Sequence, residues 1–539
     1  MLEKVVLITK NSKHQLLNIE VKNHKYEIDL SWIEKSKETS FDIEFVFQKP
    51  IQHFRNHDYT WVDCKKDRIA TEFSPKIIKL SNDILVQANV NLGIWEVKKK
   101  FPKSLFWKFN PENAYPIVNY IGDKNEKKVI STNVKIDFEI KLELLFPKQA
   151  MEISRSKIPF SAITCFTDHC DFDTLENLKT QREFFKKQQI KVTKGFFLNH
   201  YSKREDNASF ERNSEEINKW REDGHELCYH SLSQSIKSKD ESFNDFENFQ
   251  PPYSDIPTWI DHGYQPYNLS LYNKNNKTET YFSDTMKEKG IQILWNYIDS
   301  GTSTNGVINQ INPEHFTLKS FLKGIKDLKF VNRISLLIKN IIFHYYGDEK
   351  LIINYKSSAN TFKSIVFKRQ FKNIPILFTN FYSILIPLLK VFFKWNDESE
   401  KPYKYAKYTP LFFRYRIDKK EFFIFQTLEI IDFIKTLSKN NIDKLNSEKG
   451  IFIGHTYFSA PMTYHYGKMM SSDNAISSEV ETNFAYLSSM IKENQIWNPT
   501  LNELILYLSN FYKVKFIIDD EADLKLNETF NLNVKNVDV

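Results

Sequence analysis

Polar residues that could carry acid–base or metal chemistry crowd together at the end of an apolar run. The run spans residues 158–166, and Asp168, His169, Asp171 and Asp173 follow it directly. Carboxylates and neutral imidazoles bind divalent metals, and an imidazole also exchanges protons near neutral pH. The pattern therefore predicts a buried strand that ends either at a metal centre or at an acid–base pair.

Asp173 also has a structural interpretation. Residues 173–176 fit a capping box at the start of an amphipathic helix, which explains Asp173 as well as a role in the site does. The capping box does not explain Asp168, His169 or Asp171, which precede it. These three residues remain the candidates for chemistry.

The elements around this cluster alternate between strand and helix. After residue 155 the patterns predict βα units, whose strands end in polar residues at one face of a parallel, barrel-like sheet. We expect this α/β barrel to occupy residues 155–300 and, together with C-terminal helices, 446–539. The predicted strands are residues 158–166, 192–198, 226–229, 291–295 and 451–453, and the predicted helices are 174–188 and 214–223.

The first 147 residues show a different hydrophobic pattern. Apolar and polar side chains alternate in short runs at residues 17–21, 26–30, 41–45 and 134–144. Period two indicates half-buried strands. The sequence therefore predicts a β-rich accessory domain at residues 1–147, with a structural or recognition role because catalytic residue types do not gather there.

Residues 301–445 interrupt the barrel pattern with helical and apolar segments. A stripe at 318–328 is flanked by lysines, and residues 374–393 form an apolar run long enough to span a bilayer. Pro387 and Lys390 within this run favour an insertion packed over the barrel. Peripheral membrane association through residues 302–445, or a membrane-spanning helix, stays open.

Composition narrows the class of protein. The 539 residues predict two or three domains, and the net charge of +7 is spread among interspersed lysines and acids, unlike the basic surface of a nucleic-acid binder. We therefore expect no nucleic acid among the partners. The four cysteines lack CxxC spacing, and the N-terminal residues lack the pattern of a secretory signal, so we expect a cytoplasmic protein.

Four segments carry a resemblance to a known enzyme family, and they are residues 166–173, 224–231, 293–299 and 450–455. In this order they resemble the polysaccharide deacetylases of carbohydrate esterase family 4, across about 155–300 and 445–517. The resemblance implies a distorted (β/α) barrel that holds a divalent metal, with zinc as the expected ion. It also implies hydrolytic removal of an N-acetyl or O-acetyl group from a carbohydrate or sugar conjugate, in cell-surface polysaccharide metabolism.

The resemblance further implies roles for individual residues. Asp168 matches the general base, and His455 matches the general acid. His169 or Asp171 would replace the usual metal-binding Asp, and His230 matches the first metal-binding His.

Two positions depart from the family pattern. Gln234 stands where the second metal-binding His is expected, and Gln250 replaces the Arg that orients the catalytic Asp. His225 and His262 could supply the missing ligand, but His225 lies at an odd offset from His230, which along a strand points the two rings to opposite faces.

His262, Trp295 and Asp299 are the residues we expect at the substrate. A buried Trp and a helix-capping Asp remain alternative explanations for Trp295 and Asp299.

The sequence thus predicts a metal-dependent hydrolase that acts on amide or ester bonds of an acylated sugar. A lipid-linked or nucleotide-linked sugar fits a cytoplasmic enzyme. The alternatives are a catalytically inactive protein of the same fold that binds or assembles glycans, and a membrane-associated scaffold built around the apolar insertion.

Overall fold

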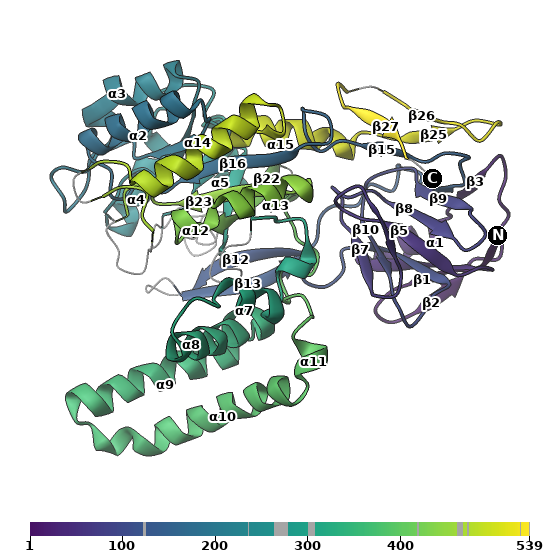
Figure 1. The fold of residues 1–539 in the computed structure, drawn as a ribbon, viewed down its shortest axis with the longest axis horizontal. Helices are drawn as coiled ribbons and strands as arrows, with labels where there is room; N and C mark the ends of the chain where they lie inside the picture. Colours follow the sequence, from purple (N-terminus) through teal and green to yellow (C-terminus); the bar gives the residue numbers. More distant parts are fainter. Residues whose placement is uncertain are drawn as a thin grey trace.

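The structure is a computed structural model that describes residues 1–121, 126–235, 237–262, 279–299, 308–417, 420–460, 467–471, 474–528 and 530–537. Its N-terminal part is a sandwich of two antiparallel sheets, each with six strands in the described residues (Figure 1). One sheet has the order β2-β1-β4-β11-β10-β7 and the other β3-β14-β9-β8-β5-β6. A short helix, α1 (Ser31–Ser36), lies between β3 and β4 in the chain.

The sandwich strands are β1 (Leu2–Ile8), β2 (Lys13–Gln15), β3 (Lys25–Glu27), β4 (Phe41–Phe47), β5 (Ile51–Arg55), β6 (Trp61–Asp63), β7 (Arg68–Ala70), β8 (Ile77–Leu80), β9 (Leu85–Ala88), β10 (Ile94–Val97), β11 (Ser104–Phe109) and β14 (Glu143–Leu145).

Alternating side chains explain β4, where every second residue is buried in the core between the two sheets. The prediction was wrong for most of residues 134–144, because only the last two residues of this stretch lie in a strand, β14 (Glu143–Leu145). Ile136 and Phe138 still pack against the sandwich core from irregular backbone. Period two there reflects an extended segment with one side on the core, and residues 17–21 likewise form no strand.

One hairpin of the N-terminal part reaches away from the sandwich. Strands β12 (Tyr115–Ile121) and β13 (Glu126–Thr132) pair with each other, and in the described residues neither joins the sandwich sheets. The Asn296 side chain of the barrel donates to the Pro116 carbonyl (2.6 Å) and accepts from the Val118 amide (3.2 Å). The hairpin therefore ties the N-terminal part to the barrel (Figure 1).

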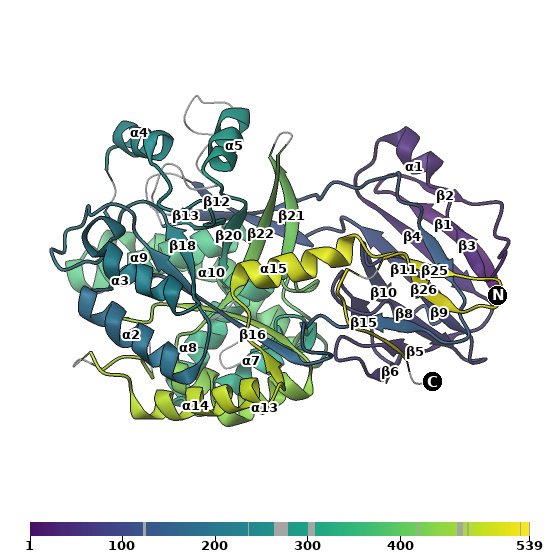
Figure 2. The ribbon, with the colours of Figure 1, turned by 90° about the horizontal axis from the view of Figure 1, so that it is seen from above.

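The second unit is a closed barrel of seven parallel strands, counted over the described residues. The order is β16-β17-β18-β19-β20-β22-β23, and β23 pairs with β16 to complete the ring. The expected (β/α) barrel beside a β-rich domain is thus confirmed, and Figure 2 shows helices outside the barrel and the sandwich to one side. The barrel strands are β16 (Ala162–Asp168), β17 (Thr193–Phe196), β18 (Glu226–His230), β19 (Thr258–Ile260), β20 (Ile293–Asp299), β22 (Lys420–Glu429) and β23 (Ile451–Thr456).

Other elements complete this unit, namely α2 (Leu175–Gln188), α3 (Phe210–Glu222), α4 (Lys239–Asn248), α5 (Glu279–Glu288), α12 (Phe433–Thr436), α13 (Lys439–Ser447), α14 (Ser478–Lys492), α15 (Leu501–Ser509), β21 (Phe412–Ile417), β24 (Ile496–Trp497), β25 (Phe516–Ile518) and β26 (Leu524–Leu526). Near the chain ends of the two units, β15 (Met151–Ile153) pairs with β27 (Val534–Asn536).

The two faces of β16 belong to different cores. Ile163 and Cys165 lie in the cluster that fills the barrel, whereas Phe166 packs with the outer helices. Because successive side chains of a strand point to opposite faces, Thr167 continues the inner face and Asp168 the outer face. This parity decides which polar residues meet at the end of the barrel.

The barrel takes one strand from within the range predicted as the insertion, since β22 lies inside residues 301–445. The helical part between β20 and β21 is therefore shorter than predicted. It comprises α7 (Leu318–Gly324), α8 (Phe330–Asn340), α9 (Glu349–Lys368), α10 (Ile374–Phe393) and α11 (Trp395–Glu398), with short 3-10 helices at Pro313–His315 and Phe371–Asn373 and a π-helical segment at Ile341–Tyr346.

Helices α9 and α10 form an antiparallel hairpin that projects from the rest of the molecule (Figure 1). Within the described residues, the segment Phe371–Phe393 is long and apolar enough to cross a membrane by length and composition, and only 17% of its most apolar window is buried.

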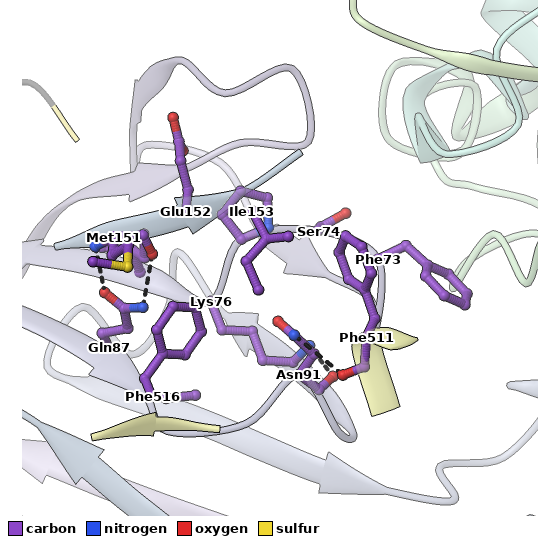
Figure 3. A pocket seen from close by; sticks show the side chains of 13 residues that line it. Phe73, Ser74, Lys76, Gln87, Asn91, Met151, Glu152, Ile153, Phe511 and Phe516 are labelled. Carbon is purple, nitrogen blue, oxygen red and sulfur yellow. Dashed lines mark hydrogen bonds between the residues drawn. The ribbon is translucent and has the colours of Figure 1, made fainter. Parts of the chain in front are cut away.

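A small cavity lies where the sandwich meets the C-terminal segment (Figure 3). Lys76 is buried there and donates to the carbonyls of Thr71 (2.8 Å) and Asn91 (2.6 Å). The Gln87 side chain hydrogen-bonds both backbone groups of Met151 (Figure 3). With a volume of about 10 Å³, the cavity has room for about one water molecule, so it belongs to the joint between the units.

Candidate metal centre

Three predicted residues meet at the carboxyl ends of β16 and β18. His169, Asp171 and His230 are buried, and one nitrogen or oxygen atom from each lies within 4.8 Å of the other two. His230 Nε2 is 2.9 Å from Asp171 Oδ2 and 3.1 Å from His169 Nδ1. These are the ligand types, in the number, that a divalent metal site requires.

Local backbone structure holds each of the three residues. His230 is the last residue of β18, and the next residue, Ser231, turns the chain with a φ of +55° and donates its amide to the Ile260 carbonyl. The His169 amide donates to the Thr456 carbonyl (2.7 Å), which fixes the first residue after β16 to the end of β23.

Asp171 sits in the turn before α2, where Asn207 and Gln234 both donate to its main-chain carbonyl. Gln234 therefore supports the backbone of the cluster, although the family resemblance expects a metal-binding His at this position.

Two further histidines surround the group. His262 Nε2 is 2.7 Å from Asp171 Oδ1, the carboxylate oxygen that His230 does not face, and 18% of its side chain is exposed. His455 Nε2 lies 2.6 Å from His169 Nε2, while its Nδ1 is 2.7 Å from the Thr167 hydroxyl. Sequence reasoning placed His262 and His455 in this site, and the structure brings both to it.

Burial sets the protonation states of these groups. It lowers the pKa of His169 well below the usual value, with neighbouring His455 and His230 adding to the effect, and it lowers the pKa of His455 to about 3. Burial opposes ionisation of Asp171, but His230 and His262 outweigh it and hold the Asp171 pKa well below its ordinary range. Neutral imidazoles beside a carboxylate are the forms that bind metal.

The hydrogen-bond pattern of the cluster also fits a cation. His230 Nε2 can carry a single hydrogen, yet it faces both an Asp171 oxygen and a His169 nitrogen at hydrogen-bond distance. His230 Nδ1 is buried and has no hydrogen-bond partner. A divalent ion would satisfy the converging lone pairs of His169, Asp171 and His230 at once.

Aromatic rings line the cluster. The Trp295 ring lies 5.0 Å from that of His169 and 4.5 Å from that of His455, and it is almost wholly buried. Tyr457 stacks on His169 at 4.7 Å, and Phe197 packs against His230 at 5.3 Å. Trp295 thus contacts the imidazoles from inside the barrel.

Asp168 does not join the cluster. It is fully buried on the outer face of β16, where Lys194 pairs with it and, at 2.5 Å, with Asp173. The Phe458 amide also donates to Asp168 (3.3 Å), and burial raises the Asp168 pKa to about 7 against the pull of Lys194. Asp173 likewise belongs to this ion group. It is not the capping residue of α2, because that position is taken by Thr174, one residue later.

Other predicted residues have different places. His225 accepts a hydrogen bond from the Val192 amide and packs on Trp220, away from the cluster. Gln250 is exposed. The cation that pairs with Asp168 is Lys194. Asp299 ends β20 in register with Thr427, but its side chain lies outside the described residues.

Sequence reasoning missed Thr167, Lys194, Tyr457 and Glu429. Thr167 is two residues before His169, so strand parity could have found it. Glu429 ends β22, pairs in register with His455, and follows Phe425 and Thr427 at a spacing of two on the inner face. Its inward position becomes recognisable only once β22 is known to be a barrel strand.

Comparisons with known proteins give little. No family model matches the chain, and no curated protein matches it. Two solved structures of a Flavobacterium johnsoniae GH31 dextranase are similar to it, a mutant complexed with isomaltotriose at 7% identity and a TM-score of 0.23, and a glucose complex at 8% identity and 0.26. The matches cover 49% and 93% of this chain, and the chain spans 34% and 66% of the dextranase chains. Similarity at this level supports no assignment.

Proposed function

We propose that the protein is a metal-dependent hydrolase that removes an acyl group from a carbohydrate or sugar conjugate. The observation that carries the proposal is the buried group of His169, Asp171 and His230 at the carboxyl ends of the barrel strands. Catalytic groups of such barrels gather at this end. The sugar class and the acetyl group come from the resemblance to polysaccharide deacetylases.

His169, Asp171 and His230 would hold the ion, with His262 as the fourth residue beside Asp171. This set of imidazoles with one carboxylate suits zinc. When bound, such an ion supplies Lewis-acid polarisation of the acyl oxygen and a bound water with a pKa near 7.

Proton transfer requires residues that face the same space. We assign Glu429 the role of general base, because β22 carries it on the inner face beside His455. Asp168 is separated from this space by its strand, so we assign it a positioning role through its ion group with Lys194.

His455 is a poor acid at neutral pH, since burial keeps its imidazole neutral and both ring nitrogens face partners, Thr167 and His169. We propose that it orients His169. His262 is the more exposed imidazole and lies outside the group of three metal-binding candidates. As an alternative to its role beside the ion, it would donate a proton to the leaving group.

Elemental analysis of the purified protein tests the proposal. We expect near-stoichiometric zinc or another divalent metal in the wild type and its loss in a His169→Ala/His230→Ala double variant, with His225→Ala as a buried-histidine control that keeps the metal. We then expect the metal-loaded protein to release acetate from acetylated sugars.

If the protein holds no metal after repletion, the hypothesis of a metal-dependent enzyme is rejected, and a non-catalytic glycan-binding protein is favoured. Metal without hydrolysis of any acylated sugar would reject the reaction but retain the site.

A further inference from the structure

Helix α10 carries an apolar stripe that the protein leaves uncovered. Its exposed residues recur at the spacing of one helical face, and many are more than half exposed. They are Ile374 (38%), Phe378 (68%), Phe381 (54%), Tyr382 (65%), Ile386 (52%), Leu389 (41%), Phe392 (45%) and Phe393 (85%), while Ile376 (51%) is exposed outside this face. The last turn of α9 adds Phe367 (79%), and the turn into α10 adds Phe371 (62%).

Side-chain hydrogen bonds join α9 to α10 and to the turn between them. Asn354 donates to Ser383 (2.9 Å), and Asn380 donates to Ser357 (2.9 Å). Near the turn, Asn373 donates to Ser364 (3.2 Å). Helices that associate inside lipid use small and polar residues at their interface in this way, with apolar side chains turned outward.

The hairpin is nevertheless attached firmly to the body. Ile384, Leu388 and Val391, on the other face of α10, are buried in the main core. Tyr346 donates to the Pro387 carbonyl (3.1 Å), which holds the base of α10 at the proline inside the helix. The exposed stripe is therefore presented by a fixed helix.

Charge around the stripe is one-sided. Residues 349–394 contain eight basic residues and one acidic residue, a net charge of +7 that equals the formal charge of the whole chain. The rest of the protein therefore sums to zero. Lys368, Arg369 and Lys372 lie exposed at the turn, and Lys390 and Lys394 at the other end of α10.

We propose that the α9–α10 hairpin docks the protein on an anionic phospholipid bilayer, with the apolar stripe of α10 in the headgroup and acyl boundary. Basic residues that flank apolar ones favour such a surface. A full span by the hairpin is excluded because α9 carries Lys356, Lys363 and Asn360 along its exposed side. A second copy is a poorer occupant, because a symmetric pairing of this face would bring two charges of +7 together.

Vesicle co-sedimentation tests the inference. The full-length protein is mixed with phosphatidylcholine vesicles that contain or lack phosphatidylglycerol. We expect the wild type to sediment with the anionic vesicles and to bind the neutral ones at least about 100-fold more weakly. A Phe371→Ser/Phe378→Ser/Phe381→Ser variant should lose binding to both, and Lys368→Gln/Arg369→Gln/Lys372→Gln should lose about 100-fold on anionic vesicles.

The matched control is Phe101→Ser, which removes an exposed phenylalanine (51%) from the sandwich and should sediment like the wild type. Unchanged thermal unfolding of the apolar variant shows that it is folded, as expected for exposed positions. A wild type that stays in the supernatant, or a Phe101→Ser variant that loses binding equally, overturns the inference. A wild-type dimer that the apolar variant dissociates, without vesicle binding, also overturns it and assigns the stripe to a second copy.

Discussion

The carboxyl end of the barrel and the α9–α10 hairpin depart from ordinary burial in opposite directions. At the barrel end, imidazoles and a carboxylate are buried together, and His230 Nε2 faces two partners with a single hydrogen. On the hairpin, phenylalanines and isoleucines lie in solvent while asparagine and serine side chains join the helices. We propose that each region is completed by something outside the chain, an ion in the first case and a lipid surface in the second.

In a second buried polar group, the protein itself supplies the partners for the buried charges. Lys194 lies between Asp168 and Asp173 on the outer face of β16, so both carboxylates have a cation supplied by the protein itself. The histidine cluster on the inner face has no cation of this kind among the described residues. The following changes test that distinction, from the largest expected effect to the smallest.

Lys194→Met should cause the largest loss of stability. Removing one partner of a buried ion group leaves Asp168 and Asp173 without a cation, and such changes cost about 3–5 kcal/mol. Urea unfolding would measure the difference. Lys187→Met is the control, because its pair with Glu481 is exposed and should change stability by less than about 1 kcal/mol. Equal losses in the two variants would contradict the role assigned to Lys194.

Asp171→Asn should weaken metal binding by about 100-fold or more, because the amide keeps the shape but lacks the charge that a divalent ligand set needs. Competition with a chelator would measure the affinity. Stability without metal should also fall, because His230 and His262 hold the Asp171 pKa low and the amide loses that interaction. Retention of wild-type affinity would remove Asp171 from the site.

Glu429→Gln should lower the hydrolytic rate constant by about 100-fold while metal content stays at the wild-type level. A lower rate with unchanged metal content distinguishes a proton-transfer residue from a metal ligand. Asp168→Asn provides the comparison, since a general base at Asp168 would give the larger loss of rate per folded molecule.

Glu448 belongs to a polar group at the opposite end of the barrel, and the partners of its carboxylate come from the protein itself. It lies 3.1 Å from His315 and just before β23. Burial opposes its ionisation, but His315 and Asn309 outweigh this effect and lower the Glu448 pKa to about 2. A depressed folded pKa stabilises the protein above the unfolded value near 4.3, and the stabilisation is lost as pH falls from there toward 2.

Glu448→Gln should therefore reduce the free energy of unfolding by about 1–3 kcal/mol at pH 7, with a difference from wild type that shrinks at pH 3. Chemical unfolding at both pH values would measure it. A difference that does not depend on pH would show that packing, and not charge, explains the effect.

Phe378→Ala should have the smallest effect on stability, within about 0.5 kcal/mol, because the side chain is 68% exposed. Ile384→Ala on the buried face of the same helix should cost about 2–5 kcal/mol. Thermal unfolding of the two variants compares the faces directly. A large loss in Phe378→Ala would mean that the stripe packs within the protein.

The sequence predicted the βα units of the barrel well because buried parallel strands and amphipathic helices leave strong local patterns. It failed at residues 134–142, since one-sided packing of irregular backbone gives the same period two as a strand. It also missed β22, which lies beyond the long helical segment and carries Glu429.

Within the site, residue types were more predictable than their directions. Asp168 and His169 are adjacent in sequence and look like one cluster, but strand parity sends them to opposite faces of β16. His262 could only be suggested, because its approach to Asp171 depends on β19, which two other strands separate from β16.

Ring closure of the barrel has a consequence for how the chain reaches its native state. Ile163 of β16 pairs with Ile451 of β23, so one edge of the first barrel strand waits for residues that leave the ribosome much later. Until then, that strand and the growing sheet expose unpaired backbone and apolar side chains, which favour misassociation. We therefore expect slow maturation, dependence on chaperones, and aggregation of nascent chains that stop before β23.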